Sequence, residues 1–201
     1  MNRLSMLERS RVIAALAEGT SINATVRMNG VAKHTILKLL KDVGSTCAEY
    51  HNRIVRNVNV RRAQFDEIWA FCYAKEKNLP EELRGKFGYG DVWTWMAIDA
   101  DTRLIRSYIV GALGSSTAHA FMRDLSRRVA NRFQLTTDGH RVYADAVERA
   151  FGSEIDYSML VKLFGNDPSE SKTRYSPATC IGCRTPSSAA SPIRSTLVRV
   201  S

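Results

Sequence analysis

The spacing of apolar residues changes at about Arg62, and this change constrains the fold more than any other feature of the sequence. Before it, apolar residues recur every three or four positions, which is the period of amphipathic helices. After it, short segments rich in aromatic and β-branched residues predict strands. We therefore expect a small helical unit followed by a larger unit of class α/β.

The first part of the chain predicts three helices. The first covers about Leu4 to Ala17 and is followed by Gly19, a second begins after Ser21, and a third runs from about Ala32 to Val43 and ends before Gly44. Three short helices with Gly-containing turns are typical of a helix-turn-helix unit, whose last helix enters the major groove of DNA. The side chains expected to face DNA from that helix are Lys33, His34, Thr35, Lys38 and Lys41.

Basic charge is concentrated in the same part of the chain. The whole sequence carries a net charge of +9, and residues 1–62 hold 11 Lys or Arg against 4 Asp or Glu. Lys and Arg that neutralise phosphates release counterions, so this asymmetry favours DNA as a partner. A plain three-helix bundle with a solvated basic face is the alternative that charge and pattern alone leave open.

The second part predicts a mixed α/β order. Three strands, a helix, a strand, a helix and a strand follow one another, and a charged, Gly-rich loop is expected at 75–90. Such an order gives a central sheet with antiparallel and parallel pairs. The expected strands are 64–72, 92–98, 104–110, 132–136 and 157–163, and the expected helices are 117–130 and 142–151.

Two carboxylates stand at positions that favour metal chemistry. Asp66 lies within the first expected strand among apolar and aromatic residues, and Asp138 follows the fourth strand. If those strands are parallel neighbours, the two carboxylates meet at one edge of the sheet, where Mg²⁺ could bind through them and through substrate phosphates. Each has an alternative explanation, since Asp138-Gly139 is a common turn pair, and Glu67 is expected to point to the opposite face of the strand.

Several segments together resemble a known family. The segment from Gln64 to Gly165 resembles the catalytic core of bacterial insertion-sequence transposases of the DDE type, close to the group typified by insertion sequence one. The matching runs are FDEIW (65–69), WTWMAIDADTRLIRSYIVG (93–111), HAFMRDLSRRV (119–129), QLTTDGHRVYADAVERAFG (134–152) and IDYSMLVKLFG (155–165).

This resemblance implies a ribonuclease H-like fold, with Asp66 and Asp138 as metal-binding catalytic carboxylates and Mg²⁺ or Mn²⁺ as the cofactor. It also implies an enzyme that cleaves DNA at the ends of a mobile element and joins the freed 3′-hydroxyls to target DNA. The helix-turn-helix would recognise the terminal inverted repeats in double-stranded DNA, and a homodimer on DNA is a possible assembly.

The sequence departs from the family where the third carboxylate is expected. The family has a Glu on a helix after the fifth strand, whereas residues 185–201 are rich in Ser and contain no acidic residue, which favours disorder. Glu170 is the only acid after Asp167 and is a weak candidate for that ligand. We hypothesise that a frameshift or premature stop has removed the genuine ending, so that catalysis is lost and DNA binding remains. The alternative function is a non-catalytic DNA-binding remnant, competitor or regulator.

These observations divide the chain into four expected parts. They are a helix-turn-helix domain at 1–45, a basic linker at 46–62, a partial ribonuclease H-like core at 63–184 and a disordered tail at 185–201. No apolar run is long enough for a membrane span and no signal peptide is visible, so a cytoplasmic, nucleoid-associated protein is expected. Cys180 and Cys183 have the spacing of half a zinc site, but without a second pair they are expected to be loop thiols.

Overall fold

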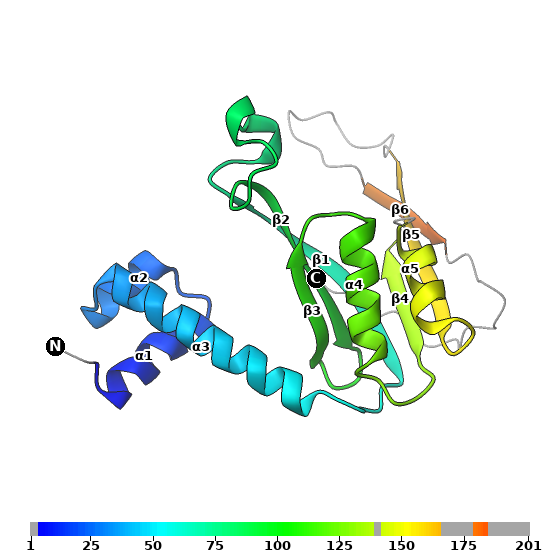
Figure 1. Cartoon of the computed structure of the whole chain (residues 1–201), viewed down its shortest axis with the longest axis horizontal. Coiled ribbons are helices and arrows are strands. Elements are labelled where there is room, and N and C mark those ends of the chain that lie inside the picture. The colour runs from blue at the N-terminus through cyan, green and yellow to red at the C-terminus, as the bar shows by residue number, and fades with distance from the viewer. Residues whose placement is uncertain (1–3, 139–141, 166–178, 185–201) are drawn as a thin grey trace. The chain divides into compact units, whose positions relative to one another are not determined.

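The computed structural model describes residues 4–138, 142–165 and 179–184, and for 161–165 and 179–184 it describes the backbone only. The chain forms two compact units, Met1–Val55 and Arg56–Ser201, and each is treated by itself below. Figure 1 shows that the first unit is helical and that the second is built around a sheet.

The helical unit contains the three predicted helices. They are α1 (Met6–Ala17), α2 (Ile22–Asn29) and α3 (Lys33–Ile54). A capping box between Ser5 and Glu8 begins α1, and α2 ends at Gly30, whose positive φ of 64° is the left-handed conformation that ends many helices. Val12, Val31 and Ile36 form the buried centre of this unit, so all three helices depend on one small core.

The third helix is longer than predicted. Its expected end before Gly44 was wrong, because α3 continues through this glycine to Ile54 and takes in much of the expected linker at 46–62. A glycine inside a helix costs only about 1 kcal/mol relative to alanine. No proline or left-handed residue follows until Asn57, so nothing in the intervening sequence stops the helix.

The second unit contains a mixed sheet of six strands within the described residues. The strand order is β3-β2-β1-β4-β5-β6. In this sheet β1 pairs in parallel with β4 and β4 with β5, whereas β2 is antiparallel to both β1 and β3. The predicted class, α/β with a mixed sheet of parallel and antiparallel strands and helices packed on it, is confirmed. The strands are β1 (Arg62–Cys72), β2 (Gly90–Asp99), β3 (Ile105–Gly111), β4 (Gln134–Asp138), β5 (Asp156–Gly165) and β6 (Thr179–Arg184).

Two segments expected to be loops contain regular secondary structure. The backbone of Cys180 and Cys183 belongs to β6, which pairs antiparallel with β5, so the loop predicted there was wrong. The expected loop at 75–90 contains two 3-10 helices, η1 (Glu76–Asn78) and η2 (Glu81–Leu83). Both segments are short, and hydrophobic periodicity is a weak signal over so few residues.

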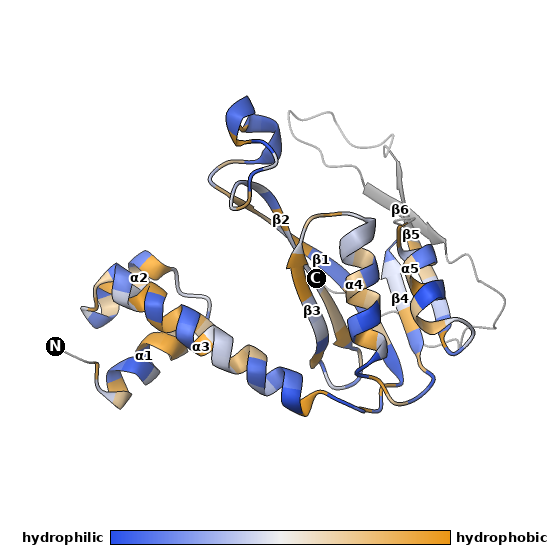
Figure 2. Ribbon diagram, in the orientation of Figure 1, coloured by the Kyte–Doolittle hydropathy of each residue, from blue (hydrophilic) through white to orange (hydrophobic). Residues whose placement is uncertain are grey.

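Two helices cover one face of the sheet. They are α4 (Ser115–Ser126) and α5 (Val142–Phe151), which lie side by side in front of the strands in Figure 1. Their apolar sides face the strands and alternate with hydrophilic positions in Figure 2. The core that they form includes Ala63, Phe65, Trp95, Ala97, Phe121, Leu125, Leu135, Tyr143 and Val147.

The chain enters this unit along the end of α4. Val58 exchanges backbone hydrogen bonds with Arg128 and Ala130, and the side chain of Asn131 both accepts from and donates to the backbone of Val60. These bonds hold the start of β1 in register with β4. In the described ranges, none of the helices has the length and apolar composition needed to cross a bilayer.

Candidate metal centre and DNA-facing helix

The carboxylates of Asp66 and Asp138 come from neighbouring parallel strands. The register pairs Arg62 with Gln134 and Gln64 with Thr136. The pairing ends there, and the same register extended by two residues would place Asp66 level with Asp138, the last residue of β4. The two aspartates were expected to lie close together if their strands were parallel neighbours. β1 and β4 are parallel neighbours.

Both aspartates lie on the face of the sheet that α4 and α5 leave uncovered. Side chains alternate along a strand, and Phe65 and Thr137 point into the helix-covered side, where they are 5% and 2% exposed. Asp66 and Asp138 directly follow these two residues and are exposed. Solvent and an anionic ligand can therefore reach both carboxylates from the same side.

Glu67 makes this acidic edge unusual. It lies on the helix-covered side, opposite Trp95 on the neighbouring strand, and is partly buried. Burial raises the pKa of Glu67 to about 7, and the negative charges of Asp138 and Asp66 raise it further in the same direction. Its backbone N–H donates to Asp66 Oδ1 at 2.9 Å. The carboxyl groups of Asp66, Glu67 and Asp138 are thus electrostatically coupled.

The charge of Asp138 also affects the pKa of Tyr157 on the covered side of the sheet. The hydroxyl oxygens of Tyr157 and Thr137 are 2.9 Å apart, and Thr137 also donates to the carbonyl oxygen of Asp138 at 3.0 Å. Burial raises the pKa of Tyr157, and the charge of Asp138 acts in the same direction. The end of β4 is therefore fixed by buried hydrogen bonds directly beneath the exposed carboxylate.

The chemistry of this edge fits a divalent cation. Mg²⁺ and Mn²⁺ favour carboxylate oxygens, and one or two protein carboxylates with additional water or phosphate ligands suffice for Mg²⁺. The pKa of Glu67 is raised by burial first and then by the charges of Asp138 and Asp66, so all three carboxyl groups act on one another here. Within the part of the chain that the structure describes, no three His, Cys, Asp or Glu side chains are grouped to hold a metal ion.

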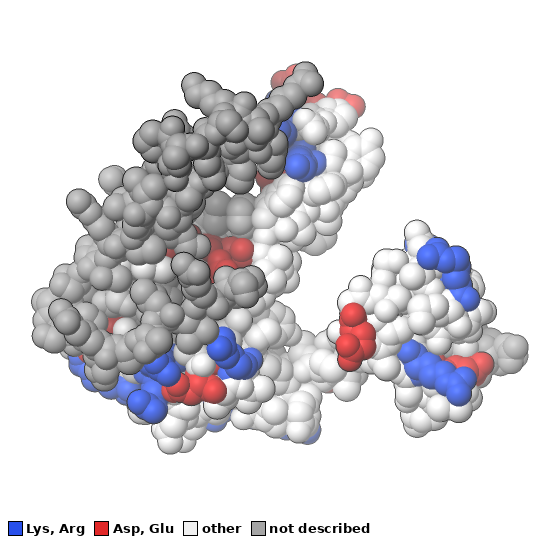
Figure 3. Space-filling view, turned by 180° about the vertical axis from the view of Figure 1, so that it is seen from behind, with Lys and Arg blue, Asp and Glu red and all other residues white. Residues whose placement is uncertain are grey.

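The helix expected to face DNA exposes its basic residues together. His34, Lys38 and Lys41 follow one another at intervals of four and three residues, so they share one side of α3 and are exposed. Lys33 is also exposed, whereas Thr35 is half-buried, closer to the side that packs through Ile36. Figure 3 shows basic side chains projecting from the surface of the helical unit.

Other predicted features lie outside the described residues. They are the low-ranking third carboxylate Glu170, Gly139 in the predicted turn after Asp138, and the expected tail at 185–201. The coupling of Glu67 to the aspartates was not predicted, and it arises from burial beside Trp95 together with the charges of Asp138 and Asp66. The signal available in the sequence was a second carboxylate adjacent to Asp66 in an apolar strand.

Comparisons with known proteins find similarity in structure alone. The chain matches no family model and no curated sequence. It is similar to the piggyBac transposase in a synaptic complex with hairpin DNA, with 11% identity, 87% of this chain and 46% of that chain covered, and a TM-score of 0.41. It is also similar to a Mos1 strand transfer complex, with 12% identity, 78% and 59% covered, and a TM-score of 0.34. A Mos1 paired-end complex with Mn gives 13% identity, 74% and 58% covered, and a TM-score of 0.28.

The chain spans about half the length of these structures. At this level of similarity, the function has to be argued from the residues of the chain itself.

Proposed function

We propose that this chain is a transposase-type DNA-binding protein whose sheet unit binds a divalent metal ion through Asp66 and Asp138. The observation that carries the proposal is the parallel pairing of β1 with β4, whose register, extended by two residues, would bring the two exposed aspartates level on one face. The raised pKa of Glu67 beside them supports it, because a cation would compensate the negative potential found there.

The helical unit has the role of binding double-stranded DNA. Exposed His34, Lys38 and Lys41 on one side of α3 supply cations for phosphates and donors for base edges. In the finer form of the proposal, the DNA is the terminal inverted repeat of a bacterial insertion sequence, and two copies of the chain act together on it.

The sheet unit has the role of holding DNA phosphates next to the metal. A divalent ion supplies Lewis acidity for phosphodiester cleavage and strand transfer. Asp66 and Asp138 would hold such an ion on the open face, and the hydrogen bonds of Thr137 and Tyr157 fix the end of β4. The proposal thus assigns catalysis to the middle of β1 and the carboxyl end of β4.

A second candidate function is DNA binding without cleavage. The observation that favours it is that, among the described residues, no third His, Cys, Asp or Glu is grouped with Asp66 and Asp138 to hold a metal ion. Both candidates require DNA binding by α3. They differ in whether the DNA is cut when a metal ion is present.

Neutralising the basic side of α3 is expected to weaken duplex binding. In Lys38→Gln/Lys41→Gln, loss of two phosphate contacts lowers the slope of log K against log salt by about 2, because each contact contributes about 0.9. Fluorescence anisotropy of labelled duplex DNA across a salt series measures this slope. Arg11→Gln, which removes an exposed cation of α1, is the control and should keep the wild-type slope. An unchanged slope in the double variant would rule out α3 as the DNA-facing helix.

Removing either aspartate is expected to abolish metal binding while sparing duplex binding. Mg²⁺ or Mn²⁺ should raise the melting temperature of the wild-type chain, because a ligand that binds only the folded state stabilises it. Asp66→Asn and Asp138→Asn should lose that increase and any metal-dependent cleavage of labelled element-end DNA. Asp101→Asn, an exposed carboxylate at the β2–β3 turn, should retain both.

The outcomes of these experiments separate the candidates. Cleavage lost in both aspartate variants supports the enzyme. Metal binding and DNA binding without cleavage support the second candidate. Equal metal stabilisation of the wild type and both aspartate variants would contradict the proposed metal site.

A further inference from the structure

The hairpin formed by β1 and β2 extends well beyond the sheet. β1 pairs with β2 as far as Cys72, whereas its pairing with β4 ends at Gln64 and β3 reaches β2 only from Trp93. Figure 1 shows this hairpin, with η1 and η2 at its end, projecting from the sheet. Large apolar side chains on it are exposed to solvent, namely Ile68, Trp69, Phe71, Tyr73, Phe87 and Tyr89.

The end of the hairpin is an ordered structure. Leu79 is 3% exposed, and the backbone N–H of Glu76 donates to Asp91 Oδ1 at 3.0 Å. Gly90 has a φ of +85°, and a Cβ on it would lie 1.9 Å from Glu76 Oε2, so the glycine lets this carboxyl pack against the backbone. These contacts hold η1 against the start of β2.

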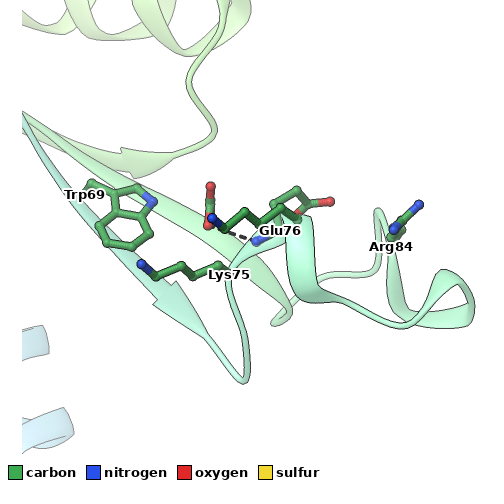
Figure 4. Close-up of a pocket in the computed structure, with 6 residues that line it drawn as sticks. Trp69, Lys75, Glu76 and Arg84 are labelled. Atoms are coloured by element: carbon green, nitrogen blue, oxygen red, sulfur yellow. Dashed lines mark hydrogen bonds between the residues drawn. The ribbon is translucent and has the colours of Figure 1, made fainter. Parts of the chain in front are cut away.

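A cavity of about 660 Å³ opens on this structure. Its lining combines an aromatic ring, three cations and two carboxylates, and its volume is in the range of small-ligand sites. The lining residues are Trp69, Lys75, Glu76, Lys77, Arg84 and Asp91. In Figure 4, Trp69 and Lys75 lie at one side of the pocket and Arg84 at the other, with Glu76 between them.

The charges in this cavity favour an anionic ligand. The carboxylate of Asp91 accepts the backbone hydrogen bond from Glu76, and the carboxyl of Glu76 is packed against Gly90. Lys75, Lys77 and Arg84 are exposed. An aromatic platform with cations around it is the arrangement that binds single-stranded nucleic acid, through base stacking and phosphate contacts.

We infer that the pocket of Trp69, Lys75, Lys77 and Arg84 binds an unpaired nucleotide of DNA, with the base on the Trp69 ring and the phosphates on the three cations. This inference deepens the proposed function and rests on it for the presence of DNA. Trp69 lies three residues beyond Asp66 on the same strand, a distance of about 10 Å along β1. Because side chains alternate along a strand, Trp69 lies on the opposite face of β1 from Asp66, so a single strand leaving the acidic edge would have to pass around β1 to enter the pocket.

The position of Lys75 is compatible with this ligand. Its Nζ lies 4.9 Å from the centroid of the Trp69 ring. An exposed cation–π contact contributes about 0.5–1 kcal/mol, whereas stacking of a base on an aromatic side chain contributes about 1–3 kcal/mol. Exchanging the ammonium for a base is thus favourable, and the displaced Lys75 gains a phosphate partner.

The test is binding of a labelled single-stranded thymidine oligonucleotide by the full chain, without divalent cations and over a salt series. Trp69→Ala should weaken this binding by about 5- to 150-fold, which corresponds to the stacking energy of one base. Trp69→Phe should restore most of it. Lys75→Gln/Arg84→Gln should lower the salt slope by about 1.4, because each phosphate contact to a single strand contributes about 0.7.

Controls keep the result specific to the pocket. Phe87→Ala removes a fully exposed aromatic ring outside the cavity and should bind the oligonucleotide like the wild type. Duplex affinity should be unchanged in Trp69→Ala, because that binding depends on α3. Circular dichroism melting shows whether each variant is folded, and the Lys75/Arg84 variant leaves the hairpin's apolar contacts intact.

Two results would overturn the inference. One is wild-type affinity of folded Trp69→Ala for the oligonucleotide. The other is a change in sedimentation of Trp69→Ala from dimer to monomer with unaltered oligonucleotide binding, which would identify a second copy of the chain as the occupant. Loss of duplex binding in the α3 variant is a separate readout, so failure of the proposed function is distinguishable from failure of this inference.

Discussion

Replacing Asp99 with alanine is expected to destabilise the sheet unit by about 3–5 kcal/mol, because it leaves a buried guanidinium without its partner. Asp99 is 2% exposed, and its Oδ2 accepts hydrogen bonds from Arg106 at 2.6 and 3.2 Å. Its Oδ1 accepts from the backbone N–H groups of Asp101 and Thr102. One carboxylate therefore closes the β2–β3 turn and compensates the charge of Arg106, which is 9% exposed.

The effect of this substitution should depend on pH. Burial by itself would raise the pKa of Asp99, but the hydrogen bonds from Arg106, Asp101 and Thr102 outweigh it and hold the pKa below its ordinary value of 3.8. A carboxyl with a lowered pKa stabilises the fold above its ordinary pKa, and this contribution is lost as the pH falls through the folded-state pKa. The difference between wild type and Asp99→Ala should therefore be full at pH 7 and shrink in acid.

Urea unfolding followed by tryptophan fluorescence measures this difference. All three tryptophans, Trp69, Trp93 and Trp95, belong to the sheet unit, so the signal reports on that unit alone. Asp101→Ala is the matched control, because Asp101 pairs with Arg62 at the surface, where an ion pair contributes less than about 1 kcal/mol. Equal decreases in the free energy of unfolding of the two variants would show that the buried Asp99–Arg106 pair stabilises the fold no more than the surface pair.

Replacing Glu67 with glutamine is expected to stabilise the chain at pH 8 in the absence of divalent cations. The folded-state pKa of about 7 lies above the ordinary value of 4.5. Below pH 4.5 the carboxyl is neutral in both states, and between 4.5 and 7 it ionises first in the unfolded chain, so stability falls as the pH rises. Above pH 7 the penalty is complete, and the uncharged glutamine removes it.

The size of this gain follows from the shift in pKa. A shift of this size corresponds to about 3 kcal/mol at most, since one pKa unit is worth 1.36 kcal/mol. Glu67 is only partly buried, so solvent screening reduces the expected gain to roughly 1–2 kcal/mol. The wild type and Glu67→Gln should be equally stable near pH 4.

A pH series of urea unfolding experiments tests the prediction. Glu81→Gln, an exposed carboxyl in η2, is the control and should follow the wild type at every pH. Mg²⁺ should reduce the advantage of Glu67→Gln at pH 8, because a cation at Asp66 and Asp138 removes part of the repulsion. A variant that is no more stable than the wild type at pH 8 would contradict the assigned cause of the pKa shift.

The regular elements of this chain were largely predictable because their apolar periods are long and distinct. The helical spacing of apolar residues predicted the helices before Arg62, and the aromatic-rich segments after it predicted the first five strands. Most of these elements differ from the prediction by only a few residues at their ends. The end of α3 and the strand β6 were not predictable in this way. Gly44 is a weak stop signal that the helix overrides, and β6 is too short to show a period.

The proximity of Asp66 and Asp138 was also predictable, but only on the assumption that their strands are parallel neighbours. Their place in the sequence suggested a meeting on parallel neighbouring strands, whereas the register that makes them level depends on pairing across 72 residues. The electrostatic state of Glu67 had only one local signal, the adjacent carboxylate of Asp66, because it arises mainly from burial opposite Trp95 and from the distant charge of Asp138.

The sequence by itself thus determined the division into a helical and a mixed α/β unit, the basic character of the first, and the carboxylates available in the second. Period and charge are local properties, and neighbouring residues suffice to express them. Only the tertiary structure decided which carboxylates share a face, why Glu67 holds its proton near neutral pH, and how Trp69 and three cations come to line one cavity. Those properties depend on strand register and burial, which the chain acquires only when distant segments pack together.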